Sequence, residues 1–170
     1  MRNDTCLWKT PLALAAGLLC GAPAWAQCAG AAAVPGQAAA QIVALTGQGE
    51  TRAAAVQPWA GAALAQRLAP GADLRTLALS SAALLLADRT QIRLAAQAQV
   101  RLCDSGPAAS RLELAVGRLW ARTKRSQADV QLQTPAALAA VRGTDWDVEV
   151  DASGRTTLTV LSGRIDVSNA

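Results

Sequence analysis

The sequence of 170 residues contains no histidine, no tyrosine and no phenylalanine, so five tryptophans are its only aromatic residues. Without histidine the chain cannot form a Ser-His-Asp triad, a Cys-His pair, a histidine-ligated zinc site or a histidine pH switch. Without Phe and Tyr it also lacks the aromatic strip on which single-stranded bases stack. Any catalysis would have to use carboxylates, cysteine, hydroxyl groups, lysine or arginine. An apolar fraction of 52% excludes an intrinsically disordered chain, and the length indicates one domain.

The first 26 residues have the pattern of an export signal. A weakly basic start with Arg2 and Lys9 precedes an apolar run from Pro11 to Ala22, and an Ala-Trp-Ala segment ends at Ala26. This order is typical of a secretory signal peptide, residues 1–26, that is cleaved after Ala26. The alternative is an uncleaved anchor helix, but the apolar run is shorter than the ~20 residues of a membrane span. The sequence therefore predicts a periplasmic or secreted protein with no stable membrane span after cleavage.

Cleavage would leave two cysteines, Cys28 and Cys103, in the mature chain. In an oxidising compartment they could form one disulfide that ties the N-terminus to the loop at 103–107. However, residues 27–40 are rich in Ala, Gly and Gln, which predicts a flexible lead-in, and Cys28 could then fail to meet Cys103. Both alternatives stay open at this stage.

From residue 41 onward the dominant pattern is alternation of apolar and polar residues. Turn residues separate the alternating segments at roughly ten-residue spacing, which is typical of an all-β domain. The strand candidates are 42–45, 84–86, 92–94, 100–102, 112–116, 130–133 and 145–151. Only residues 59–68 have a pattern that fits a helical turn. We therefore predict an all-β domain over 41–169, built as a compact multi-stranded antiparallel sheet, a β-roll or a β-solenoid.

The charge distribution does not indicate a nucleic-acid partner. Loss of residues 1–26 would lower the net charge from +4 to +3, and the remaining basic residues are scattered along the chain. This is ordinary surface charge rather than a continuous basic footprint. The short basic segment 122–125 is interpreted as a solvated turn rather than a polyanion site.

Residues 134–150 resemble the central motif of the FecR domain. Thr134-Pro135 is followed by small residues, then by Val-Arg-Gly-Thr, an acid, an aromatic residue and an alternating strand. The hairpin through Gly163, the strand 112–120 and the segment 70–94 resemble further parts of that domain, so the resemblance runs from 41 to 169. Two departures are Ala87–Thr90 in place of an Asp-Gly turn and Ser162-Gly163 in place of Glu-Gly. The motif residues are Thr134, Pro135, Arg142, Gly143, Thr144, Asp145, Trp146 and Gly163.

The resemblance implies a non-catalytic module that acts in envelope sensing, in protein interaction or as a scaffold. It implies a protein partner in the cell envelope and neither a cofactor nor a metal. The alternative is a component of a transmembrane pathway that regulates an extracytoplasmic sigma factor in response to iron-siderophore uptake. Regulators of that kind carry a sigma-binding region before a transmembrane helix, whereas only ten residues precede the apolar run here. We also expect either a further strand beyond residue 170 or an exposed sheet edge.

Two motif features have both a structural and a functional interpretation. Arg142 could present its guanidinium to a partner's carboxylate, or it could pair with an acid such as Asp145 while Gly143 permits a backbone bend; we favour the structural role. The alternating acids 145, 147, 149 and 151 lie about 7 Å apart on one strand face. That spacing is too wide for one cation, so we expect cross-strand pairing with Arg155 or Arg164, or solvation.

The three tryptophans after residue 26 are the largest side chains available to the core. We expect Trp120 and Trp146 in the core, and Trp59 partly exposed. The alternative for Trp59 is an aromatic anchor at a protein interface.

Overall fold

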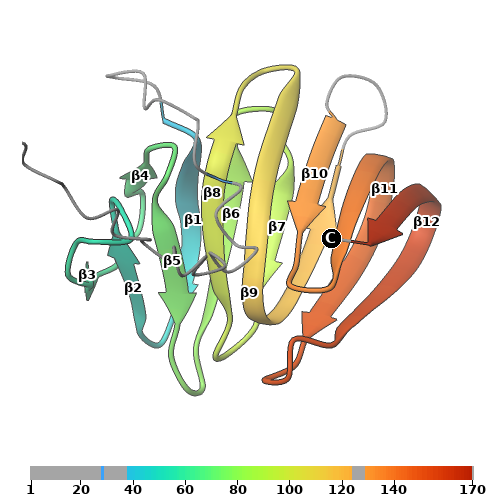
Figure 1. The fold of residues 1–170 in the computed structure, drawn as a ribbon. Coiled ribbons are helices and arrows are strands. Elements are labelled where there is room, and N and C mark those ends of the chain that lie inside the picture. Colours follow the sequence, from blue (N-terminus) through green and yellow to red (C-terminus); the bar gives the residue numbers. More distant parts are fainter. Residues whose placement is uncertain (1–27, 29–37, 124–128, 170) are drawn as a thin grey trace, which may run out of the picture.

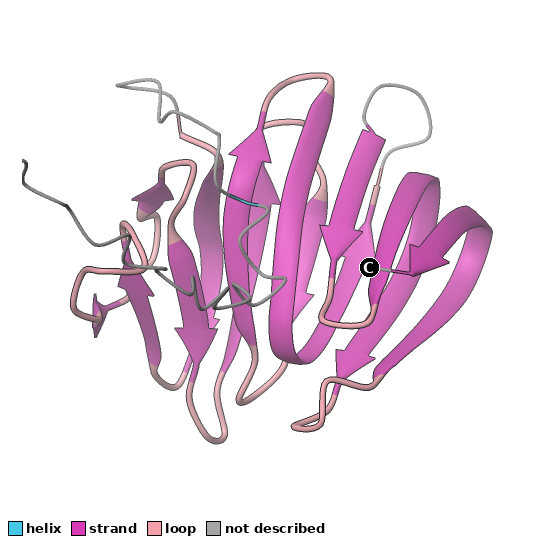
Figure 2. Cartoon of the chain, in the orientation of Figure 1, coloured by secondary structure: helices cyan, strands magenta, loops and turns pink. Residues whose placement is uncertain are grey.

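The computed structural model describes Cys28 and residues 38–123 and 129–169, and these contain twelve β-strands and no α-helix (Figure 2). The strands are β1 (Ala40–Thr46), β2 (Gly49–Arg52), β3 (Ala60–Gly61), β4 (Arg67–Leu68), β5 (Asp73–Thr76), β6 (Ser81–Leu86), β7 (Gln91–Leu94), β8 (Gln99–Ser105), β9 (Ala109–Arg122), β10 (Asp129–Gln133), β11 (Ala137–Val150) and β12 (Thr156–Asn169). The all-β prediction is confirmed. The predicted signal peptide 1–26, and all of the lead-in except Cys28 and 38–40, lie outside the described residues. A helix with the length and apolarity to cross a membrane is not found among those described.

The strands form one curled sheet, with the short strands β2, β3 and β4 at one side and the long strands β11 and β12 at the other (Figure 1). Its main path runs β3-β2-β5-β8-β9-β7-β6-β1-β4, and β10, β11 and β12 extend it from β9. Neighbouring strands are antiparallel except β9 and β10, which are parallel. The first half of β9 pairs with β8 and β10, and its second half pairs with β7 and β11. Because β9 changes neighbours midway, it joins the two halves of the sheet.

Each of the three longest strands contains a glycine with positive φ near its middle. Gly117 in β9, Gly143 in β11 and Gly163 in β12 have φ angles of 95°, 57° and 93°. In β9 the inward-facing residues have even numbers before Gly117 and odd numbers after it, and β11 shows the reverse change at Gly143. One extra residue in a strand moves the following side chains to the opposite face and increases the local twist. These bulges bend the long strands, which curls the sheet.

The inward face of the curled sheet carries a core of aliphatic side chains around one tryptophan. Leu94, Leu119 and Val148 lie opposite one another across β7, β9 and β11, and all are buried. On the next row the indole of Trp146, which is fully buried as expected, lies opposite the small Ala121. A small residue opposite a large ring leaves room for close packing between the strands.

Two expectations from the sequence are wrong, one about residues 59–68 and one about Trp120. Residues 59–68 form the two-residue strands β3 and β4 and a turn rather than a helical turn. Trp120 lies on the outer face and is only half-buried, because its neighbours Leu119 and Ala121 occupy the inward positions. The bulge at Gly117 is the physical reason: in a regular strand Trp120 would share the face of the buried residue Leu112.

Candidate interaction site

The motif residues Thr134 and Pro135 form the turn between β10 and β11. The hydroxyl of Thr134, which is buried, accepts a hydrogen bond from the Ala137 amide at 3.0 Å, and the Thr134 amide donates to the Ala137 carbonyl at 2.8 Å. Thr156 at the start of β12 donates its hydroxyl hydrogen to the Thr134 hydroxyl at 2.9 Å. A Cβ at Gly154 would lie 3.3 Å from the Pro135 ring. This half of the motif therefore holds the turn between β10 and β11 against the turn between β11 and β12.

Gly143, Thr144 and Gly163 meet where β11 and β12 both bulge. Thr144 is buried, and a Cβ on Gly163 would lie 2.3 Å from its methyl group. The Thr144 carbonyl accepts a hydrogen bond from the Thr123 amide at 3.0 Å. The close approach requires glycine at 163, where φ is 93°. This half of the motif packs two strands together.

Arg142 pairs with an acid other than the expected Asp145. Its Nε and Nη2 donate to the carboxylate of Asp129 on β10, with Nη2 2.7 Å from Oδ2, while four-fifths of the side chain stays exposed. The Arg142 hydrogen bond holds the pKa of Asp129 below its usual value. The expected partner Asp145 instead accepts from Arg122 of β9. The pairing differs because Arg142 lies before the bulge at Gly143, where β11 faces β10.

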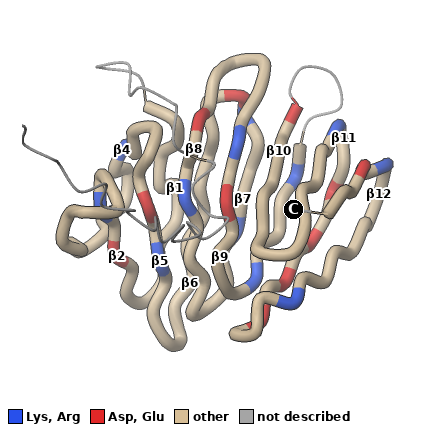
Figure 3. Tube along the Cα trace, in the orientation of Figure 1, with Lys and Arg blue, Asp and Glu red and all other residues tan. Residues whose placement is uncertain are grey.

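Two acids of the row on β11, Asp145 and Asp147, pair with arginines of β9. Asp147 accepts from Arg118 at 2.8 and 3.0 Å, and Asp145 accepts from Arg122 at 2.8 Å. Cross-strand pairing was expected, but with Arg155 or Arg164 as the donors. Each of these two acids therefore pairs with its own guanidinium. Acidic and basic positions lie on neighbouring long strands in this part of the sheet (Figure 3).

The ring of Trp59 is covered by two guanidinium groups. Arg52 and Arg75 lie 4.5 and 4.2 Å from its centre. Asp73 and Glu50 hold these arginines in turn. Trp59 is half-buried, and the contacts stabilise its ring by cation–π attraction. The structure thus places Trp59 in a local charged stack, which leaves less of it available as an interface anchor.

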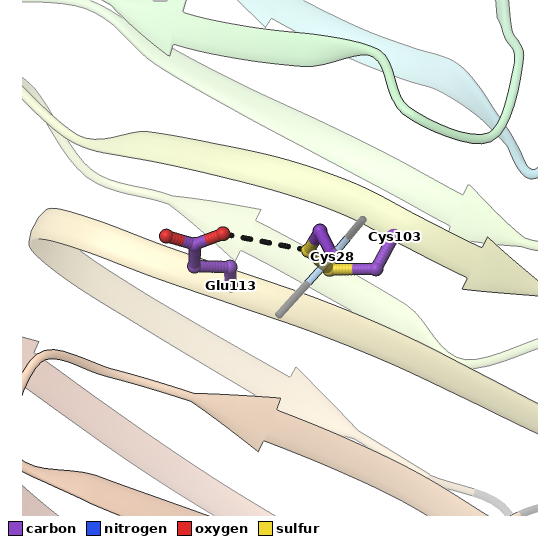
Figure 4. Close-up of side chains that lie close together, drawn as sticks. All are labelled: Cys28, Cys103 and Glu113. Carbon is purple, nitrogen blue, oxygen red and sulfur yellow. Dashed lines mark hydrogen bonds between the residues drawn. A yellow bond between two sulfur atoms is a disulfide. The ribbon is translucent and has the colours of Figure 1, made fainter. Parts of the chain in front are cut away.

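Cys28 and Cys103 are joined beside a buried carboxylate (Figure 4). Their Cα atoms are 5.1 Å apart, which is ordinary for a disulfide. Glu113 Oε2 lies 3.4 Å from Cys28 Sγ, and burial raises the pKa of Glu113 although Arg101 nearby acts to lower it. The three side chains could supply metal ligands within 4.8 Å of one another. With the sulfurs bonded to each other and Arg101 3.7 Å from the carboxylate, the geometry is that of a disulfide beside an ion pair.

A cavity of about 420 Å³ opens next to this disulfide. It is lined by Glu113, Thr134, Pro135, Asp151 and Gly154, with smaller side chains between them. The hydroxyl of Thr134 and the carboxylate of Asp151 already bond within their own turns. The cavity therefore offers one buried acid and no second group positioned for acid–base chemistry among its described lining.

The sequence leaves two alternatives open, a further strand beyond residue 170 or an exposed sheet edge, and it does not identify the residues of such an edge. In the part of the chain that the structure describes, β12 pairs with β11 alone, and Figure 1 shows it at the rim of the sheet. Val160, Leu161 and Val167 are 43%, 60% and 56% exposed. We call the unpaired side of β12 with these three residues the β12 edge. Its sequence alternates apolar and polar residues as in a half-buried strand.

Comparison with known proteins assigns the chain to a family. The family model FecR, described as FecR protein, matches residues 72–166, which is more than half of the chain. That family is a regulatory one without enzymatic activity and is typically associated with the cell envelope. Neither a curated protein nor a solved structure matches. The bulges of β9, β11 and β12 and the motif from Thr134 to Gly163 all lie inside the matched range. The chain therefore belongs to the FecR protein family.

Proposed function

We propose that this chain is an exported, non-catalytic module of the cell envelope that acts through protein–protein contacts, as a sensor or scaffold. The observation that supports it is the β12 edge, a 14-residue strand with one unpaired side and exposed apolar residues. Unpaired strand amides and carbonyls can add a partner's strand, and alternate side chains then provide specificity. Removal of a signal peptide, residues 1–26, would release the module into the periplasm or the medium.

Cross-linking of the exported protein in intact envelopes tests this function. The full chain should capture a specific envelope protein, and Leu161→Lys on the β12 edge should reduce its recovery about tenfold or more. Val56→Lys is the matched control, because Val56 is 93% exposed and lies outside the edge. Equal recovery with both variants, or recovery of no specific protein, would contradict the proposal. N-terminal sequencing of the exported chain should find Gln27 as the first residue.

The second candidate is a role in transmembrane signalling, and membership of a regulatory family supports it. The chain would then act with a separate membrane protein to control an extracytoplasmic sigma factor in response to iron-siderophore uptake. Deletion of the gene should change expression from promoters that depend on that sigma factor when a siderophore is supplied. Unchanged expression with and without the siderophore would contradict this candidate.

A further inference from the structure

The second half of β12 carries two opposite charges that have no ion-pair partner in the described part of the chain. Arg164 and Asp166 are exposed and lie on the same side of β12, two residues apart. None of the seven ion pairs of the described residues includes either one. The residue opposite Arg164 on β11 is another cation, Arg142, whose guanidinium is already bound to Asp129. The environment of Arg164 is therefore one that an additional carboxylate would stabilise.

From this arrangement we propose that the β12 edge pairs with the β12 edge of a second copy of this chain, antiparallel and about a two-fold axis at Ile165. This inference rests on the proposed function, because it names the partner of the same edge. In this register Arg164 of each copy lies opposite Asp166 of the other. The two-fold axis repeats the contact, so one dimer contains two equivalent ion pairs.

The register also satisfies the backbone. In a strand only alternate residues direct their amide and carbonyl groups away from the existing neighbour. Pairing 164 with 166 and 165 with itself joins residues of the same parity, so outward-directed groups meet outward-directed groups. A shift by one residue would place outward groups opposite inward ones and break the ladder. Backbone geometry and charge thus select the same register.

Burial of apolar side chains also favours this antiparallel pairing. Ile165 packs against the core but stays partly exposed, and Val167 is 56% exposed. A two-fold axis perpendicular to the sheet keeps the inward faces of both copies on one side. The two Ile165 side chains would then lie opposite each other, and each copy would shield the open end of the other copy's core. A pairing of identical edges is closed, so it ends at two copies.

Charge exchange between two variants tests this dimer. In a dimer of the Arg164→Asp variant both contacts place two acids opposite each other, and in a dimer of the Asp166→Arg variant both contacts place two arginines opposite each other. Each variant alone should therefore dimerise at least about tenfold more weakly than the unmodified chain. The double variant Arg164→Asp/Asp166→Arg restores both pairs in reversed order and should dimerise as the unmodified chain does. Mixing the two single variants should yield a heterodimer, because the two acidic side chains of one variant then face the two basic side chains of the other.

Light scattering after size separation, over a range of protein concentrations, measures each case on the full exported chain, with circular dichroism to verify that every variant is folded. A monomeric unmodified chain overturns the inference, and so does a dimer that the single variants leave intact or that mixing does not restore. Envelope capture that depends on Leu161 while the purified chain is monomeric would overturn the dimer and support the proposed function. A dimer without any captured envelope protein would support the dimer and contradict an envelope partner.

Discussion

Asp73 differs from the other acids of the sheet in its burial. It is fully buried, and its carboxylate accepts hydrogen bonds from Arg52 and Arg101, with Arg101 Nε at 2.7 Å. The same hydrogen bond raises the pKa of Arg101. The exposed pair of Arg118 and Asp147 has similar distances, but water surrounds the guanidinium. Equal geometry should therefore give unequal stabilisation, because burial decides the strength of an ion pair.

Asp73→Asn should lower the free energy of unfolding by about 2–3 kcal/mol, since two guanidinium groups lose their shared carboxylate in a dry environment. Asp147→Asn, the matched control, should change it far less. Urea denaturation of both variants measures the difference. Equal losses in the two variants would show that burial does not control the strength of these pairs.

The bend of β9 depends on one position. A Cβ at Gly117 would lie 2.4 Å from Ala98 Cα and 2.9 Å from the Gln97 carbonyl oxygen, and φ there is 95°. Such distances are shorter than van der Waals contact, and the backbone on the other side cannot rotate away as a side chain can. The bend is also where β9 changes neighbours, so both halves of the sheet are affected.

Gly117→Ala should therefore destabilise the protein by roughly 2–4 kcal/mol through overlap and backbone strain. Gly61→Ala is the control, because no atom lies within 4 Å of the Cβ that it would add. Thermal or urea unfolding compares the two. A Gly117→Ala protein as stable as the Gly61→Ala protein would contradict the role of this glycine in the bend.

The turn between β11 and β12 is held by Asp151. Its Oδ1 accepts hydrogen bonds from the Ser153 hydroxyl at 2.6 Å and from the amides of Ser153 and Arg155 at 2.8 and 3.0 Å. The Ser153 hydroxyl is the largest cause of the lowered pKa of Asp151, and the two amides add to it. These bonds favour the ionised carboxylate, so they link the stability of the hairpin to pH.

Because the pKa of Asp151 is lower in the folded state, its stabilisation is fully present above the unfolded pKa of about 4 and is lost as pH falls through the folded value. Asp151→Ala should thus be less stable than the unmodified chain at neutral pH, and the difference should shrink below about pH 4. Urea denaturation across this pH range provides the measurement, with Asp104→Ala as control for the loss of one charge. A stability difference between Asp151→Ala and the unmodified chain that stays constant down to the lowest pH would contradict the role of Asp151 in holding this turn.

At the scale of the whole molecule, the disulfide joins Cys28 to Cys103 of β8 over a separation of 75 residues. A cross-link of this length restricts the unfolded chain strongly, and the loop-entropy model assigns it about 4 kcal/mol. Most of the core residues lie between the two cysteines in the sequence. The stabilisation by the disulfide should therefore affect the cooperative unfolding of the sheet as a whole.

Replacement of Cys28 and Cys103 by serine should therefore lower the free energy of unfolding by about 2–4 kcal/mol. Alkylation of the freshly exported chain before and after reduction should find the thiols only after reduction. The unmodified chain with a reductant serves as a second measurement of the same loss. Two free thiols without reduction would contradict the disulfide.

Particular residues show how far the sequence alone could lead. Alternation identified the strands around Ile92, Val100 and Val148, because side-chain period is a local property of the backbone. Trp120 was placed on the wrong face because one bulge at Gly117 reverses the alternation. The partners of Asp145 and Asp147 were assigned to the wrong strand, because strand neighbours that are distant in sequence leave no local mark in either strand.

The sequence by itself determined the all-β class, the turn at 152–154 and the motif that carries the family resemblance, since each depends on residues close together in the chain, whereas the turn predicted at Ser162-Gly163 is a bulge inside β12. Only the tertiary structure decided that β10 inserts parallel to β9, that Arg142 binds Asp129, and that β12 pairs with β11 alone among the described strands. The reason is physical: alternation specifies two faces of a strand, whereas its neighbours follow from the burial and hydrogen bonding of the entire sheet. The exposed edge with Arg164 and Asp166 is a property of that sheet, and it is where the proposed interactions are to be tested.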